Sequence, residues 1–152
     1  VPVVGKNYFP SNIQGLPTWY EIRVTGDGYQ SRSDRVDIMV AMNAQTYTQD
    51  MAELTPGGWL IYDSTWPRSR QLNRDDITVV GVPLSRMCNE RFDGVRTRIL
   101  MKNIAYVGVI AALTNIDLEV IKGLLEETFA EKQHLIAANM EAIHLGYDYA
   151  ME

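Results

Sequence analysis

A strand, a helix and a second strand follow one another within residues 36–62, and this succession constrains the fold more than any other feature. Residues 36–42 are apolar except for one aspartate, which is typical of a central strand in a parallel sheet. Residues 44–54 have a helical pattern, with Asn43 as the candidate N-cap and Pro56-Gly57-Gly58 as the end. Two strands joined through a helix run parallel with a right-handed crossover, so we expect an α/β fold.

The rest of the chain extends this alternation and then becomes helical. Strands are predicted at residues 1–4, 18–25 and 76–82, the first of them short and buried. The helices expected after them are residues 83–91, residues 95–113, a helix that starts at Asn115-Ile116-Asp117, and a last helix that ends near Gly146. The pattern predicts one domain, residues 1–152, with a three-layer α/β/α Rossmann-like fold, a mainly parallel sheet and a helical C-terminal tail.

Two of the predicted elements have informative faces. The strand at residues 18–25 alternates, and its two faces are Trp19, Glu21 and Arg23 on one side and Tyr20, Ile22 and Val24 on the other. The helix at residues 95–113 has one apolar stripe, made of Ile99, Leu100, Ile104, Val107, Gly108 and Ala111. Few charges follow Lys102, so we expect this helix to be covered on most sides.

The loop that precedes the strand at residues 18–25 is the best candidate for a binding site. Prolines and a glycine shape it, and polar groups on a rigid support suit ligand contact. Its candidate residues are Lys6, Ser11, Asn12, Gln14, Gly15 and Thr18. Asn43 and Asp63 are further candidates, because each follows the carboxyl end of a predicted strand, where open parallel sheets bind ligands. The structural alternatives are an ordered loop at a subunit interface and simple capping of the next segment.

The composition argues against several classes of function. The net charge of -5 argues against a nucleic-acid partner, and no apolar run reaches the about 20 residues that a membrane-spanning helix needs. Cys88 is the single cysteine, predicted to be a packed thiol, so neither an internal disulfide nor a four-cysteine iron–sulfur site is available. This fits a reducing, cytoplasmic location. His134 and His144 are too far apart for helical metal ligands.

Four segments, in order along the chain, resemble a known family. They are Phe9-Pro10-Ser11 with Gly15, Val36-Asp37-Ile38-Met39-Val40-Ala41-Met42-Asn43, Leu54-Thr55-Pro56-Gly57-Gly58-Trp59-Leu60-Ile61-Tyr62-Asp63, and Gly146-Tyr147-Asp148-Tyr149-Ala150 preceded by Asn139. Together they resemble the gamma subunit of the 2-oxoacid:ferredoxin oxidoreductases, called domain III in single-chain pyruvate:ferredoxin oxidoreductases. Gln14 stands where that family has an arginine, and Leu16 replaces its second glycine.

The resemblance also implies a missing piece at the start. Family members begin with a strand, a Gly-rich turn and a helix before the point where Val1 stands, and this sequence contains no G-x-G-x-x-G. The last residues, 146–152, resemble the family's junction to an alpha domain, which suggests the gamma part of a fused gamma-alpha chain of the 2-oxoglutarate or pyruvate type.

For function, the resemblance implies a non-autonomous part of an enzyme that converts a 2-oxoacid to an acyl-CoA. Thiamine diphosphate, magnesium and iron–sulfur clusters would lie on the alpha and beta subunits or domains, and ferredoxin would accept the electrons. The gamma part would help assembly and hold coenzyme A, through Lys6, Ser11, Asn12, Gln14, Gly15, Thr18 and Asn43. The alternative is a non-catalytic Rossmann-like binding or scaffold module, which the absence of a Gly-rich turn favours.

Overall fold

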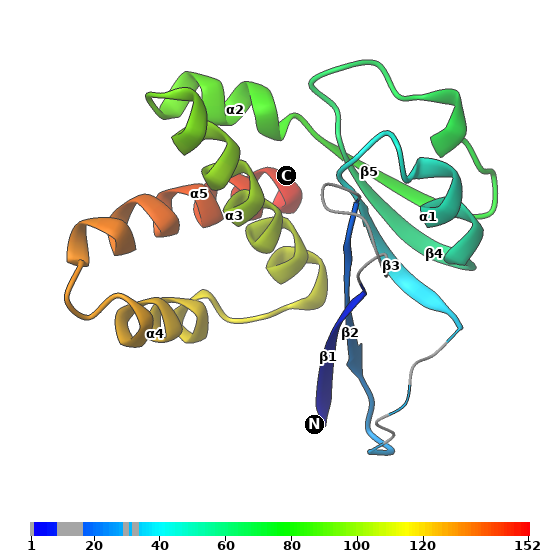
Figure 1. Ribbon diagram of the computed structural model, residues 1–152, viewed down its shortest axis with the longest axis horizontal. Helices are drawn as coiled ribbons and strands as arrows, with labels where there is room; N and C mark the ends of the chain where they lie inside the picture. The colour runs from blue at the N-terminus through cyan, green and yellow to red at the C-terminus, as the bar shows by residue number, and fades with distance from the viewer. Residues whose placement is uncertain (1, 9–16, 29–30, 32–33) are drawn as a thin grey trace. The chain divides into compact units, whose positions relative to one another are not determined.

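The computed structural model describes residues 2–8, 17–28, 31 and 34–152, and the chain divides into two compact units. The first unit consists of Val1–Ile61 and Arg68–Val80, and the second of Tyr62–Pro67 and Gly81–Glu152. The order of the elements is marked in Figure 1.

The first unit is organised around a parallel three-stranded sheet in the order β3-β4-β5 (Figure 1). Its elements are β3 (Val36–Ala41), α1 (Tyr47–Glu53), β4 (Leu54–Asp63), the 3₁₀ helix η1 (Arg70–Leu72) and β5 (Thr78–Val82). The last residues of β4 and β5 belong to the second unit. The prediction of an α/β fold with a parallel, Rossmann-like sheet is confirmed.

The ends of α1 differ from the prediction for local reasons. The Asn43 side chain accepts a hydrogen bond from the backbone N–H of Gln45 (3.0 Å). The backbone carbonyl of Asn43 accepts one from the backbone N–H of Thr46 (3.0 Å). This turn delays the helix, which begins at Tyr47. Pro56-Gly57-Gly58 does not end the helix but lies inside β4, where Gly57 has φ +81° and donates its N–H to the Asp76 carbonyl.

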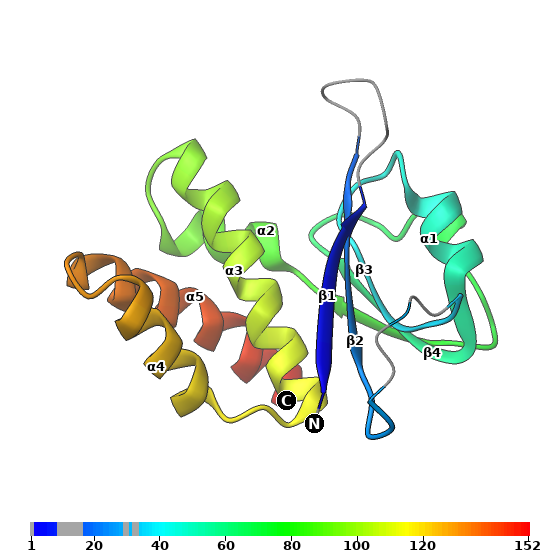
Figure 2. The ribbon, with the colours of Figure 1, turned by 60° about the horizontal axis from the view of Figure 1, so that its bottom comes forward.

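Strands β1 (Val3–Tyr8) and β2 (Trp19–Val24) form an antiparallel ribbon, and Figure 2 shows the two strands side by side. The register runs from Val3 opposite Val24 to Tyr8 opposite Trp19. The prediction of a short buried strand at residues 1–4 is wrong, because β1 is longer and mostly exposed. Two paired strands leave one face of the ribbon without a covering layer, so the described part of β1 has no fully buried residue.

The alternation predicted for β2 is confirmed, but its apolar face is the exposed one. Tyr20, Ile22 and Val24 are open to solvent, while the residues between them are half-buried. The reason is a hydrogen bond from Trp19 Nε1 to Asp50 Oδ1 on α1 (2.9 Å), which turns the Trp19 face inward. Asp50 is 2% exposed. A buried carboxylate needs such donors, so this bond fixes the side on which the ribbon packs.

The second unit is helical, and two of its helices touch backbone to backbone. Its helices are α2 (Leu84–Arg91), α3 (Val95–Thr114), α4 (Leu118–Thr128) and α5 (Gln133–Met151). Helix α5 continues past Gly146, so the predicted end there is wrong. A Cβ at Gly146 would lie 2.0 Å from the Ala105 carbonyl oxygen, and one at Gly108 would lie 1.9 Å from that of Ile143. Only glycine permits this crossing of α3 and α5.

Helix α3 packs against α2 and α5, and part of its surface stays exposed within the described chain. Gly108 and Ala111 are buried, as the apolar stripe predicts, but Ile99, Leu100 and Val107 are exposed. By length and composition α3 could span a membrane, and it is the one such helix among the described residues. Core helices of soluble proteins share that composition, and one third of the tested span is buried inside this structure.

Candidate functional site

Lys6 and Thr18 stand on the two chain segments that lead into and out of the predicted binding loop. The Lys6 side chain is exposed on β1, opposite Glu21 in the register, and its Nζ lies 5.6 Å from the centre of the Tyr8 ring. Thr18 is exposed directly before β2. The other loop residues of the predicted site lie outside the described residues: Ser11, Asn12, Gln14 and Gly15.

Asn43 is exposed beyond the end of β3 and stabilises the turn before α1. In the part of the chain that the structure describes, no hydrogen bond or ion pair joins it to Lys6 or Thr18. The structure therefore assigns Asn43 a local role as a turn former. Its predicted contact with a ligand stays a prediction.

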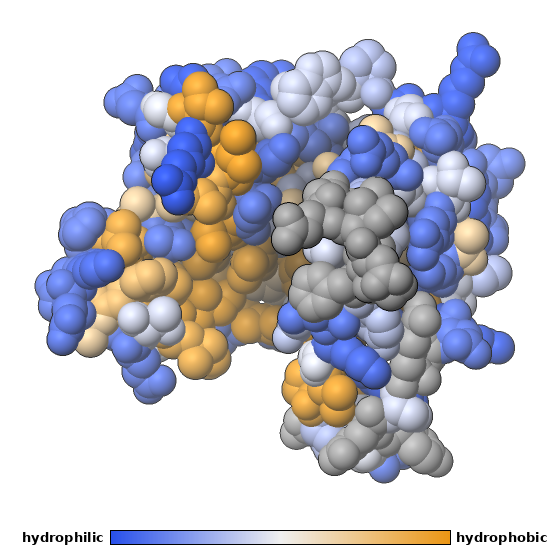
Figure 3. Space-filling view, viewed as in Figure 1, coloured by the Kyte–Doolittle hydropathy of each residue, from blue (hydrophilic) through white to orange (hydrophobic). Residues whose placement is uncertain are grey.

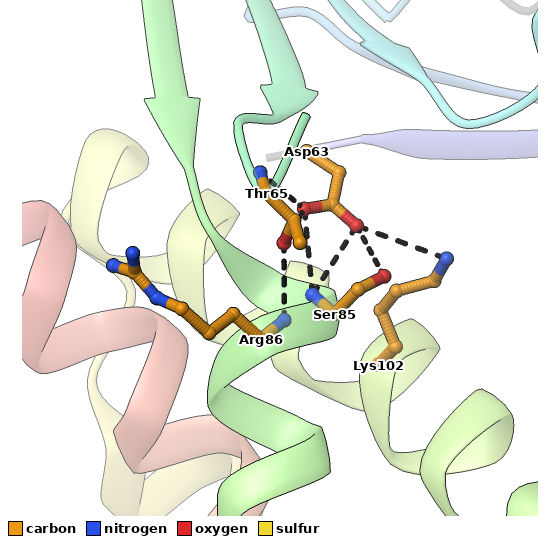
Figure 4. A network of polar contacts seen from close by, with 5 residues as sticks. All are labelled: Asp63, Thr65, Ser85, Arg86 and Lys102. Atoms are coloured by element: carbon orange, nitrogen blue, oxygen red, sulfur yellow. Dashed lines mark hydrogen bonds and ion pairs between the residues drawn. The ribbon is translucent and has the colours of Figure 1, made fainter. Parts of the chain in front are cut away.

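Asp63, at the carboxyl end of β4, is the centre of a polar network within the second unit (Figure 4). Its Oδ1 accepts hydrogen bonds from the backbone N–H (3.1 Å) and the hydroxyl (2.6 Å) of Thr65. Its Oδ2 accepts from the hydroxyl (2.5 Å) and the N–H (3.2 Å) of Ser85, in the first turn of α2. Lys102 Nζ of α3 lies 3.9 Å from the same oxygen. One carboxylate thus links β4, α2 and α3.

The hydrogen bonds decide the ionisation of Asp63. Burial alone would raise the pKa of its carboxyl group, but the bonds from Ser85 and Thr65 favour the anion more strongly, so the pKa is lowered from 3.8. The carboxylate already occupies the Ser85 N–H at the start of α2, and the Thr65 hydroxyl accepts the N–H of Arg86 (3.0 Å). Asp63 therefore caps the turn after β4 and the start of α2. Of the two roles that the sequence allows for Asp63, ligand binding and capping, the network corresponds to capping.

Cys88 is a buried free thiol, as predicted. Burial raises its pKa to about 11, with a further rise from the Asp63 charge and a smaller opposite effect of Lys102. A thiol that resists ionisation is a poor nucleophile and a poor metal ligand. Among the described residues no group of three or more His, Cys, Asp and Glu side chains could hold a metal ion.

The family model for pyruvate ferredoxin/flavodoxin oxidoreductase matches residues 1–149. The chain belongs to this family.

Curated relatives of this oxidoreductase domain are longer proteins. Subunit alpha of 2-oxoacid:ferredoxin oxidoreductase 2 from Aeropyrum pernix is 24% identical over 190 residues, covering 99% of this chain and 29% of the relative. Ketoisovalerate oxidoreductase subunit VorA from Methanothermobacter marburgensis is 26% identical over 119 residues, covering 77% of this chain and 23% of the relative. The oxidoreductase domain thus spans less than a third of the length of the curated relatives that it matches.

Solved structures share the fold of this oxidoreductase domain. A 2-oxoglutarate:ferredoxin oxidoreductase from Magnetococcus marinus, with 2-oxoglutarate, coenzyme A and succinyl-CoA bound, superposes with a TM-score of 0.80 at 24% identity, covering 97% of this chain and 25% of that chain. The gamma subunit of a keto/oxoacid ferredoxin oxidoreductase from Geobacter sulfurreducens superposes with a TM-score of 0.74 at 16% identity, covering 98% of this chain and 80% of that subunit. The resemblance found in the sequence is confirmed.

Sequence reasoning finds the pyruvate ferredoxin/flavodoxin oxidoreductase motifs but misses the partners of Asp63. Lys102 reaches it from α3, far along the chain, and no local pattern reports such a contact. Ser85 has no capping signal either, because α2 begins at Leu84 and its N-cap position is Pro83.

Proposed function

We propose that this chain is the gamma part of a 2-oxoacid:ferredoxin oxidoreductase, which oxidatively decarboxylates a 2-oxoacid to an acyl-CoA. The observation that carries the proposal is the family match over residues 1–149. The likeness to a gamma subunit over 80% of that subunit's length supports the assignment of residues 1–152 to one gamma-type domain.

The rest of the chemistry belongs to partners in this proposal. Thiamine diphosphate with magnesium and the iron–sulfur clusters lie on alpha and beta subunits or domains, ferredoxin accepts the electrons, and the assembly works in the cytoplasm. Cys88 supports this division, since its buried thiol of raised pKa is unsuited to bind a cluster. The chain itself contributes to assembly and to the binding of coenzyme A.

The test of this function is the native protein isolated with whatever copurifies. Mass spectrometry should identify alpha- and beta-type polypeptides or domains, and the preparation should reduce ferredoxin only when both a 2-oxoacid and coenzyme A are present. A lone chain that reduces nothing and ignores coenzyme A would instead support the scaffold module.

The proposed coenzyme A contact is made by Lys6, Ser11, Asn12, Gln14, Gly15, Thr18 and Asn43. Among the described members, Lys6 offers an exposed ammonium group that suits a phosphate, and Thr18 offers an exposed hydroxyl. Lys6 is held on a paired strand rather than on a free loop, which limits the entropy that a bound phosphate has to offset.

Replacing Lys6 with alanine in the whole enzyme should therefore weaken coenzyme A binding selectively. Loss of one charge-assisted phosphate bond costs about 1.5–3 kcal/mol, so the KM for coenzyme A should rise about tenfold to more than a hundredfold. The KM for the 2-oxoacid should not change. Lys6→Arg should keep most of the affinity, and Lys132→Ala, at another exposed lysine, should have no effect. An equal change in both KM values would leave Lys6 a structural residue only.

A further inference from the structure

Asp50 is a buried carboxylate to which the proposed function gives no role. It lies on α1 and is 2% exposed. Its Oδ1 accepts the hydrogen bond from Trp19 Nε1 (2.9 Å), and its Oδ2 accepts one from the Thr46 hydroxyl (2.8 Å). Because burying a carboxylate costs free energy even when donors surround it, an aspartate at this position indicates that the placement of its partners matters.

The ribbon of β1 and β2 depends on side-chain contacts for its placement in the first unit. Within the described chain, neither strand is hydrogen-bonded to the β3-β4-β5 sheet. A two-stranded ribbon is marginally stable alone, so its orientation is set by what its side chains contact. The bond from Trp19 to Asp50 is such a contact, and it joins β2 to a helix 31 residues further along the chain. It therefore fixes which face of the ribbon turns toward α1.

Lys6 lies on the same face of the ribbon as Trp19. Residues directly opposite each other in an antiparallel pair share a face, and so do residues two apart in one strand. Tyr8 is opposite Trp19 and Lys6 is opposite Glu21, so these four residues belong to one face. Lys6 Nζ lies 5.6 Å from the centre of the Tyr8 ring. The direction in which the exposed ammonium group of Lys6 points is thus tied to the Trp19 face.

Thr18, the other described strand-flanking member of the proposed coenzyme A contact, is adjacent to Trp19 in the chain. Turning Trp19 away from Asp50 would therefore displace Thr18 as well as Lys6. Hydrophilic side chains lie along the visible part of β1 and β2, in contrast with the apolar surface over α3 and α4 (Figure 3). A polyanionic ligand such as coenzyme A is compatible with polar surface of this kind.

We propose that Asp50 is a positioning residue for coenzyme A: through Trp19 it holds the ribbon so that Lys6 faces the ligand. The inference rests on the proposed function, because it requires that the chain binds coenzyme A through Lys6. Asp50 itself does not touch the ligand, since its carboxylate is buried and accepts bonds from Trp19 and Thr46. Its contribution is preorganisation, because a lysine that is already placed loses less freedom when a phosphate binds.

Isothermal titration of coenzyme A into the whole enzyme, without a 2-oxoacid, tests this role independently of activity. Asp50→Ala removes the acceptor and Trp19→Phe removes the indole N–H, so each should raise the Kd for coenzyme A about threefold or more, up to the effect of Lys6→Ala. Asp50→Asn keeps an oxygen that can accept from Trp19, so its Kd should stay within about twofold of the natural value. The KM for the 2-oxoacid should not change in any of these variants.

Two comparisons distinguish positioning from a general loss of stability. Met51 is buried next to Asp50 on the same helix, so Met51→Ala leaves a cavity there but keeps the bond between Asp50 and Trp19. The Kd for coenzyme A should not change in Met51→Ala. In the double variant Lys6→Ala with Asp50→Ala, the two single effects should combine to less than their product, because Asp50 acts through Lys6.

Several results would overturn the positioning role. They are an unchanged Kd in Asp50→Ala and Trp19→Phe, an equal rise in Met51→Ala, or single effects that multiply in the double variant. A normal Kd in Lys6→Ala would do the same, because Asp50 would have nothing to position. Failure of the proposed function gives a different result: the natural enzyme itself shows no binding of coenzyme A and reduces no ferredoxin with a 2-oxoacid, before any variant is compared.

Discussion

Replacing Gly108 with alanine should separate α3 from α5 and destabilise the helical unit. The new Cβ would lie 1.9 Å from a backbone oxygen of α5, and a backbone atom cannot move aside as a flexible side chain can. Overpacking in a core typically costs 1–3 kcal/mol, and the upper end, about 3 kcal/mol or more, is expected here. For a chain of this length that corresponds to a fall in Tm of about 6–12 °C if it unfolds cooperatively, measured by circular dichroism.

The chain offers a matched control for this substitution. Gly123 also lies within a helix, α4, but a Cβ added there would meet nothing within 4 Å. Gly123→Ala should therefore stabilise the chain by about 0.5–1 kcal/mol, through the better helix propensity of alanine. Gly146→Ala should act like Gly108→Ala. If all three variants gave similar Tm values, the close crossing of α3 and α5 would be contradicted.

Replacing Asp63 with alanine should cost about 2–4 kcal/mol in the free energy of unfolding. The substitution leaves the N–H and hydroxyl groups of the half-buried residues Ser85 and Thr65 without their acceptor, and each donor that water does not reach typically costs about 1–3 kcal/mol. Asp63→Asn keeps an acceptor oxygen and should cost less. Asp93, an exposed aspartate on the same unit, is the control, since Asp93→Ala should change the free energy little. Urea denaturation at neutral pH measures all three.

The effect of Asp63 should also depend on pH, in a direction set by its lowered pKa. Because the folded pKa lies below the unfolded value of 3.8, the stabilisation from ionised Asp63 is fully present above pH 3.8. It is lost as the pH falls through the folded pKa. The difference in unfolding free energy between the natural chain and Asp63→Asn should therefore be constant near neutrality and shrink in acid. A difference that grew in acid would contradict the assigned direction of the shift.

The parts of the fold that the sequence predicts are those encoded by local patterns. The strand–helix–strand unit from β3 to β4 is recognisable because its apolar runs and its turn residues lie close together in the chain. Element ends are harder to predict. A glycine such as Gly146 commonly marks the end of a helix. Here it lies within α5, where it permits the close contact with Ala105 on α3. The buried side of β2 likewise depends on Asp50 of α1, which alternation alone does not report.

The candidate site shows the same division between local and distant information. Asp63 is predictable as a residue at the end of a strand, whereas Lys102 approaches it through the packing of a different helix. Exposure of Lys6 and Thr18 agrees with a role in binding, but their proposed partner is another molecule. Local residue patterns in the sequence indicate strands, helices and turns. They do not indicate which distant residue or which other molecule completes the site.

The glycine crossing of α3 and α5 also restricts how this part of the protein can move. Shear motions between packed helices occur when side chains slip from one set of grooves to the next. At Gly108 and Gly146 the two backbones are in direct contact, and any sliding along the axis would bring bulkier neighbours into that position. The pair should therefore move as one rigid body during any conformational change. A displacement at the exposed side of α3 would be passed on to α5 without being absorbed between them.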